Sequence, residues 1–375
     1  NTSLSYLERL EWYGLRCRLA DVTSYPGVTT MTLTLQGSDK ISSTSENKLN
    51  LIVTRKLNGT TTRSIAEWAR YVCGTVGYAA SDLNETELSA LEAVWDDRGD
   101  WYDHAVVSAT TVKSELARVF QAGFAEFTID HGQIRPVRDQ VRTTYEQLYT
   151  PQNLLEPLKR QFQAYDPDEY NGVDVEYIDG VTWEKETVEC RLSGDAGTRV
   201  EKIRLDGVTD RTRAWRIGMR ERRMQKYRRK TYQFKTELDA LNSKYLSYCL
   251  LADDVPGYDQ SALLVDYSAT GGVATLTISE PRSGNLVALR RPDGSLAGPY
   301  TATAISDHVF TIPTPDFSPI IPGTSQEPTH VLIGQSTNYH YDVLITEINP
   351  QGNSVSVQAV NYDARVYADD DNSPA

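Results

Sequence analysis

Basic side chains crowd one stretch of the chain, and their types suggest two kinds of chemistry. The stretch reads as a helix over residues 209–228, and the basic residues in it and just beyond are Arg211, Arg213, Arg216, Arg220, Arg222, Arg223, Lys226, Arg228, Arg229 and Lys230. Cations at this density could contact the phosphates of DNA. Because they lie all round the helix in an acidic chain, we favour an exposed helix that pairs with acidic neighbours or with a neighbouring subunit.

The acidic residues form short clusters that lie beside proline and glycine. These clusters are Asp96-Asp97, Asp166 with Asp168 and Glu169, Asp253-Asp254, and Asp369 to Asp371. A glycosidase needs two acids opposed across a cleft, and an EF-hand needs calcium ligands at fixed spacing. Turn formation accounts for these acids instead, so we predict no catalytic residue and no metal site.

The histidines and cysteines are not clustered in the sequence as a catalytic or metal-binding site would require. The histidines are His104, His131, His308, His330 and His340, and the cysteines are Cys17, Cys73, Cys190 and Cys249. The chain has no GxSxG nucleophile elbow and no CxxC pair. We therefore expect the histidines to have surface or turn roles and the cysteines to be free buried thiols, and we predict no cofactor.

The totals describe an acidic chain of ordinary globular composition. Its 375 residues suffice for two to four domains, and 39% of them are hydrophobic. A formal net charge of -13 gives it no general attraction for nucleic acid or anionic lipid. It has no apolar run near the roughly 20 residues of a membrane span. Because the chain starts without methionine or a secretory signal, we expect an excerpt of a longer protein.

The first part of the chain must form strands and then helices. Residues 15–57 alternate in the manner of β-strands, and Asn58-Gly59 ends that pattern. Helices are predicted from an N-cap at Ser64, over 85–94 and over 111–120, where Gly123 is expected to act as a C-cap. A β-hairpin over 125–137 turns at Asp130-His131-Gly132.

The second part of the chain is predicted to be mainly β. Residues 173–178 and 183–192 are expected to form a strand pair, and the basic helix leads into a strand over 230–235. From about residue 251, closely spaced short strands are separated by turn pairs such as Asp293-Gly294. This spacing is typical of a small barrel or sandwich.

These elements predict an α+β, mainly β, multidomain fold with small β-barrel or sandwich domains and a helical α+β insertion. The predicted segments are a β segment at 1–58, an α+β insertion of three helices plus a hairpin at 59–160, a β segment with the basic helix at 161–250, a small β-barrel at 251–368, and a solvated acidic tail or linker at 369–375.

The order of these modules resembles a known family. The motifs on which this resemblance is based are Phe124–Asp139 (FAEFTIDHGQIRPVRD), Asp166–Tyr177, Arg211–Tyr227 followed by Thr231–Glu237, Leu251–Tyr258 (LADDVPGY), and Val357–Asp370 (VQAVNYDARVYADD). Together they resemble the central hub region of the tip attachment, or host-specificity, proteins of lambda-like phages with long flexible tails. The resemblance covers most of residues 60–370. It departs from the family's Pro-Gly-Asp turn, because Tyr258 follows Gly257 and the aspartate comes one place later.

The resemblance implies a baseplate-hub-like scaffold in the virion. A member of this family forms a homotrimer at the end of the tail tube, joins the tube and other tail-tip proteins to host-attachment modules, and takes part in adsorption and DNA delivery. It would be assembled in the host bacterial cytoplasm. Such a protein would reach the bacterial receptor through modules outside this chain. The family has no catalytic residues that could be assigned to positions in this sequence.

Two other functions remain open. The 22 tyrosines and the paired acids would suit a carbohydrate-binding or carbohydrate-degrading module of a tail spike. The basic helix would suit direct DNA binding, which we consider less favoured than a role in subunit pairing.

Overall fold

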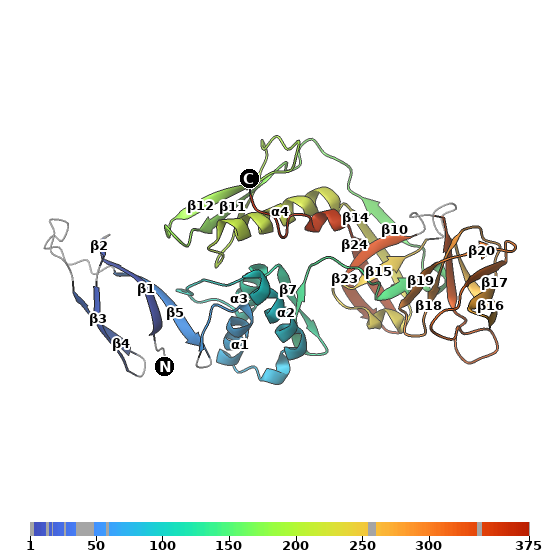
Figure 1. The fold of residues 1–375 in the computed structure, drawn as a ribbon, viewed down its shortest axis with the longest axis horizontal. Coiled ribbons are helices and arrows are strands. Elements are labelled where there is room, and N and C mark those ends of the chain that lie inside the picture. The colour runs from blue at the N-terminus through green and yellow to red at the C-terminus, as the bar shows by residue number, and fades with distance from the viewer. Residues whose placement is uncertain are drawn as a thin grey trace. The chain divides into compact units, whose positions relative to one another are not determined.

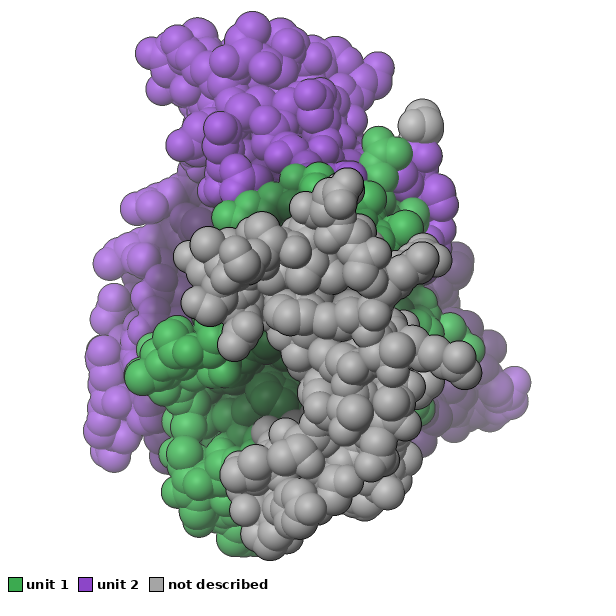
Figure 2. All heavy atoms as spheres, turned by 90° about the vertical axis from the view of Figure 1, so that its left-hand side faces the viewer, with its two compact units in different colours: residues 1–138, 177–185, 205–213 green, residues 139–176, 186–204, 214–375 purple. Residues whose placement is uncertain are grey.

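A computed structural model describes residues 4–12, 15–16, 18–25, 28–34, 49–57, 60–253, 260–335 and 340–374 (Figure 1). The chain divides into two compact units (Figure 2). Unit 1 comprises Asn1–Arg138, Tyr177–Lys185 and Leu205–Arg213, and unit 2 comprises Asp139–Glu176, Glu186–Arg204 and Ala214–Ala375. Cys17, the break at Asn58-Gly59, Asp254 and the turn around Gly257 lie outside the described residues.

Unit 1 begins with short antiparallel sheets, as the alternating pattern predicts. A four-stranded sheet has the order β2-β1-β5-β6, and β3 pairs with β4 in a hairpin. The strands are β1 (Leu4–Trp12), β2 (Leu15–Arg16), β3 (Arg18–Tyr25), β4 (Val28–Thr34), β5 (Leu49–Leu57) and β6 (Thr60–Thr61).

Three helices and a hairpin follow, at the places the sequence predicts. They are α1 (Ile65–Thr75), α2 (Glu85–Arg98), α3 (Val112–Gln121), β7 (Ala125–Asp130) and β8 (Gln133–Arg138). The Ser64 side chain caps α1 by accepting the backbone N–H of Glu67 at 3.2 Å. Asn84 and Thr111 cap α2 and α3 in the same way, so each helix start satisfies an otherwise unpaired donor.

Gly123 differs from the C-cap that the sequence suggests. The left-handed conformation is taken by Phe124, at a φ of 57°. Gly123 instead lets the buried Trp95 approach closely, and the indole Nε1 donates a hydrogen bond to the Gly123 carbonyl at 2.9 Å. A Cβ at this position would lie 2.2 Å from Trp95 Nε1, so the core of unit 1 requires glycine here for space.

Unit 2 contains the basic helix, α4 (Arg211–Tyr227), whose residues from Ala214 onward belong to this unit. It lies along a three-stranded sheet of order β12-β11-β13 (Figure 1). The strands are β11 (Val173–Ile178), β12 (Lys185–Cys190) and β13 (Glu201–Arg204), and β11 and β13 are parallel. Glycine at 218 makes the close approach possible, since a Cβ there would lie 2.4 Å from Val175 Cγ2 and 2.5 Å from Cys190 Sγ.

A six-stranded sheet of order β10-β14-β24-β23-β15-β9 follows in unit 2. Its strands are β9 (Gln147–Tyr149), β10 (Lys159–Phe162), β14 (Lys230–Thr236), β15 (Tyr248–Leu251), β23 (Tyr341–Gln351) and β24 (Ser354–Asn361). The sequence pattern placed the last two strands in the C-terminal barrel, but they pair with β15 and β14. Local alternation predicts a strand but does not identify the strand with which it pairs. The division of the chain into the five predicted segments stays a prediction.

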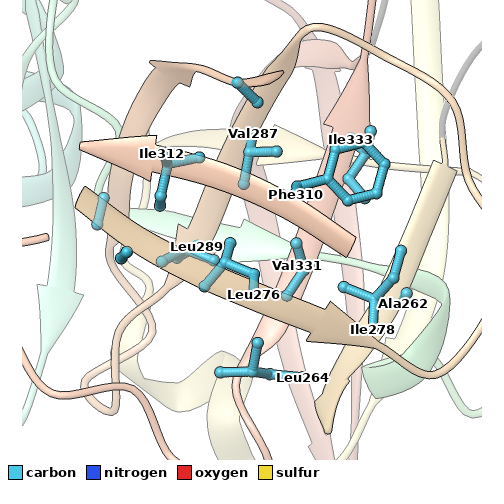
Figure 3. Packing of buried hydrophobic residues seen from close by; sticks show 13 residues of the cluster. Ala262, Leu264, Leu276, Ile278, Val287, Leu289, Phe310, Ile312, Val331 and Ile333 are labelled. Carbon is cyan, nitrogen blue, oxygen red and sulfur yellow. The ribbon is translucent and has the colours of Figure 1, made fainter. Parts of the chain in front are cut away.

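The remaining strands form a seven-stranded antiparallel sheet of order β19-β18-β22-β16-β17-β21-β20. They are β16 (Gln260–Thr270), β17 (Val273–Ile278), β18 (Leu286–Arg290), β19 (Leu296–Thr301), β20 (Thr303–Ala304), β21 (Val309–Pro313) and β22 (His330–Gly334). The sheet wraps around a buried apolar core that includes Leu276, Leu289, Phe310 and Ile333 (Figure 3). Within the described residues its pairing does not close into a barrel.

The predicted fold class is confirmed as mainly β with several sheets. Four α-helices and the short 3-10 helices η1 (Ala80–Asp82), η2 (Pro151–Asn153), η3 (Leu238–Asn242) and η4 (Ala364–Tyr367) complete the described part. None of its helices is both long enough and apolar enough to cross a membrane.

The contact at Gly218 gives a first testable prediction. We expect Gly218→Ala to destabilise unit 2 by about 1–3 kcal/mol, because a methyl group would overpack against Val175 and Cys190. Urea unfolding followed by circular dichroism measures the effect. Gly74→Ala is the matched control, since a Cβ at this position in α1 meets nothing within 4 Å. In a helix this change should be neutral or stabilising by about 0.5–1 kcal/mol. Equal effects of the two changes would contradict the prediction.

Candidate functional site

The basic helix is the candidate site that the sequence singles out, and most of its arginines bind carboxylates of the same chain. Within unit 1, Arg213 is 6% exposed and its Nε lies 3.3 Å from a carboxylate oxygen of Asp100, which is 1% exposed. Arg213 also donates to the carbonyl of Trp101 at 2.7 Å and to that of Ala122 at 3.0 Å. Burial lowers the pKa of Arg213, and Asp100 opposes this effect.

The most buried network in unit 2 joins α4 to Asp139 and Asp370. Arg220 donates from Nε to Asp370 Oδ1 at 3.0 Å and from Nη1 to the Asp139 carbonyl at 2.8 Å. Nη1 of Arg228 lies 2.7 Å from Asp139 Oδ2, and Tyr367 donates its hydroxyl to Asp139 Oδ1 at 2.7 Å. Burial alone would raise the pKa of Asp139, but these donors hold it below its usual range.

The acidic segment near the C-terminal end lies along the same helix. Arg223 pairs with Asp369 at 2.6 Å, and Arg216 donates to the carbonyls of Asp371 and Asn372. Asp370 is only 8% exposed. The sequence suggested a solvated tail here, but in the structure this segment packs against α4. Its carboxylates can be buried because the arginines of α4 supply a countercharge for each one that is buried.

Two further arginines fix loops at the C-terminal end of α4. Arg222 binds Asp195 with two hydrogen bonds, of 2.8 and 2.7 Å, and also donates to the Tyr170 carbonyl at 3.0 Å. Arg229, just beyond the helix, binds Glu169 with two hydrogen bonds, of 2.7 and 2.6 Å. These paired contacts hold two loops in defined positions because the guanidinium group matches a carboxylate in two places.

Of the ten basic residues, Arg211, Lys226 and Lys230 are exposed, whereas Arg213, Arg220 and Arg222 are buried, so the expectation of an exposed helix is wrong. The structure thus brings most of the predicted basic residues together with acids that are 27 to 150 positions distant in sequence, such as Asp195 and Asp370. Sequence reasoning missed these partners because their separation carries no local signal. Contact of the helix with a neighbouring subunit or with DNA stays a prediction.

The other acidic clusters have structural roles. Asp96 and Asp97 lie in the last part of α2 rather than in the loop that the sequence suggested. Asp166 forms a turn, in which its side chain accepts the backbone N–H of Asp168 at 2.8 Å. Asp253 is 6% exposed and pairs with Arg160 at 3.2 Å. Among the described residues, no three His, Cys, Asp or Glu side chains gather as metal ligands would.

One histidine departs from the expected surface or turn role. His330 is 2% exposed, its Nδ1 lies 2.8 Å from the Thr150 hydroxyl, and its Nε2 lies 3.0 Å from a carboxylate oxygen of Glu327. A hydroxyl, an imidazole and a carboxylate in this order resemble a nucleophilic triad. However, Thr150 is 0% exposed, so no substrate can reach its hydroxyl. The arrangement is therefore suited to packing.

The expected cysteine chemistry is confirmed where the chain is described. Cys73, Cys190 and Cys249 are free and buried. Burial raises the pKa of Cys190 to about 12 and also raises the pKa of the other two thiols. These thiols are therefore poor nucleophiles and poor metal ligands at neutral pH.

Arg220 provides a test of the ion-pair network. Arg220→Met should destabilise unit 2 by about 3–5 kcal/mol, because it leaves the carboxylate of Asp370 buried without its partner. Urea unfolding again measures the change. Arg211→Met, at an exposed position of the same helix, should change stability by less than about 0.5 kcal/mol. A small loss in both variants would show that the network contributes little.

His330 predicts a dependence of stability on pH. Burial lowers its pKa from the usual 6.5, so the unfolded chain takes up a proton at a higher pH than the folded chain. The contribution is fully present above pH 6.5 and declines as the pH falls toward the lowered pKa, with a slope of at most about 1.4 kcal/mol per pH unit. His330→Gln should remove this part of the slope below about pH 6.5 in denaturation curves. An unchanged slope would contradict the assignment.

Comparisons with known proteins agree with the resemblance seen in the sequence. Residues 111–244 match a family model described as "Putative phage tail protein". This match runs from α3 through η3 and includes the whole of α4. No curated protein matches the chain.

Similar solved structures include three from tails or virions. A chain of the "Virion of native gene transfer agent (GTA) particle" is 13% identical with a TM-score of 0.46, covering 81% of this chain and 48% of its own length. The tail protein from Neisseria meningitidis MC58 is 9% identical with a TM-score of 0.35, covering 67% of each chain.

The 43 kDa tail protein of prophage MuSo2 from Shewanella oneidensis is 12% identical with a TM-score of 0.36, covering 68% of this chain and 66% of its own. This chain thus spans about half the length of the gene-transfer-agent chain. The family match over residues 111–244 shows that the chain is similar to phage tail proteins.

Proposed function

We propose that this chain is a structural virion protein that forms the central hub of a phage tail tip. It joins the tail tube to host-attachment modules and takes part in adsorption and DNA delivery, as in the lambda-like family that it resembles. The observation that supports this proposal is the match of residues 111–244 to a phage tail family. In this proposal the chain acts as a homotrimer with the tail tube and other tip proteins as partners, and it is assembled in the host bacterial cytoplasm.

A role without catalysis is consistent with how the described polar groups are used. The hydroxyl of Thr150 is sealed from solvent, and the buried thiols are protonated at neutral pH. The acids around α4 neutralise arginines, which suits a scaffold that must keep one geometry. Contact with the bacterial receptor would be made by modules outside this chain.

The alternative is a carbohydrate-binding or carbohydrate-degrading module of a tail spike. Degradation requires an acid whose pKa is raised so that it can donate a proton. Hydrogen bonds from Arg229 instead lower the pKa of Glu169. For Asp195, burial opposes the shift, but Arg222 still lowers the pKa. Of the two activities, binding is the one that a specific pocket of unit 2 favours.

Its place in the assembled tail tests the hub proposal. Immunogold electron microscopy of tails containing this chain should label one end of the tail, distal to the capsid. Quantitative mass spectrometry should give three copies per tail, as a closed trimer requires. Antibody preincubated with the purified chain is the control for specific labelling. Label along the whole tube, or a copy number in proportion to tube length, would show a tube component instead.

A further inference from the structure

A pocket of about 290 Å³ lies in unit 2, beside the C-terminal half of α4. Its walls come from three segments: the loop before β11, the loop after β12, and the end of α4. The lining residues are Tyr165, Glu169, Tyr170, Asn171, Ser193, Gly194, Asp195, Ala196, Arg222, Gln225, Lys226 and Arg229. This volume is close to the lower end of the range for small-molecule sites, so the pocket would hold one or two small rings.

The two ion pairs described above make the pocket rigid. Arg222 holds the loop after β12 through Asp195, and Arg229 holds the loop before β11 through Glu169. Arg229 also donates to the carbonyl of Gln163 at 2.8 Å, which fixes the same loop at a second point. A ligand would meet groups already in place and would lose little free energy in ordering them.

Two tyrosine rings at this pocket are exposed to solvent. Tyr165 is 79% exposed and Tyr170 is 54% exposed. Their exposure leaves aromatic faces available to a ligand. Rings of this kind bury the C–H faces of a sugar, and the ammonium group of Lys226 provides a donor for its polar groups. This combination distinguishes a saccharide from a purely apolar ligand.

The charge of the pocket narrows the class of ligand. Three cations, Arg222, Lys226 and Arg229, are opposed by two carboxylates, so the lining carries one net positive charge. Lys226 is exposed and is therefore the cation most accessible to a ligand. The two carboxylates would repel a polyphosphate, whereas one negative charge on a ligand would be balanced.

We propose that this pocket binds a saccharide that carries a single carboxylate, with Tyr165 and Tyr170 stacking on the sugar and Lys226 contacting its carboxylate. The site goes beyond the hub role and does not depend on it, because a hub without this pocket would still assemble. Sugar acids of this type would be encountered as components of a bacterial surface, where a binding site on a tail protein would retain the particle.

Titration calorimetry and saturation-transfer NMR on the full chain test the site with matched probes. Galacturonate should bind at concentrations below about 10 mM, and galactose, which lacks the carboxylate, should bind more weakly. Inorganic phosphate at the same concentration should not displace galacturonate. Displacement by phosphate would reveal a simple anion site, and no binding of galacturonate would also overturn the proposal.

Variants separate the roles of the residues without touching the ion pairs. Tyr165→Ala should weaken binding of galacturonate about tenfold, which corresponds to about 1.4 kcal/mol, and Tyr165→Phe should keep most of it. Lys226→Met should abolish the preference for galacturonate over galactose. Tyr78→Ala, at a 46% exposed tyrosine outside the pocket, is the matched control. An equal loss in Tyr78→Ala, or none in Tyr165→Ala, would remove the tyrosine from the site. Tail assembly is measured separately, so failure here leaves the hub proposal standing.

Discussion

The burial of arginine side chains on α4 is the constraint on which unit 2 depends most. A guanidinium group removed from water costs several kcal/mol unless a carboxylate and carbonyl oxygens replace the lost hydration. Arg220 and Arg222 are both less than a tenth exposed, and each has a carboxylate partner. The helix can therefore occupy its place only when the segments that carry Asp370 and Asp195 are in theirs. Electrostatics thus couples parts of the chain that are remote in sequence.

This coupling provides specificity more than stability. A well-packed apolar side chain at Arg220 together with an apolar partner could be as stable as the ion pair, but it would fix the geometry less strictly. Gly218 adds a steric condition on the same helix, because its missing side chain sets how closely α4 approaches Val175. A protein that must hold several partners in register benefits from both restrictions. The hub role that we propose would use this rigidity.

The sequence predicts those features whose signals are local. The cap at Ser64, the hairpin turn at His131 and the α4 helix all follow from residues within a few positions of one another. The pairing of β24 with β14 does not, because the two strands are separated by more than a hundred residues and alternation looks the same in any sheet. The burial of His330 escaped prediction for the same reason, since Thr150, its partner, is 180 residues away.

The candidate pocket is formed by the same ion pairs that stabilise the loops around α4. Arg222 and Arg229 are used to hold two loops, and the space that remains between those loops and α4 is the pocket. The tyrosines at this pocket make no comparable contribution to packing, because each of these residues is more than half exposed. Structure and binding are thus divided between different residues of one site. The ligand specificity of the pocket would change through Tyr165, Tyr170 and Lys226 while the scaffold around them is kept.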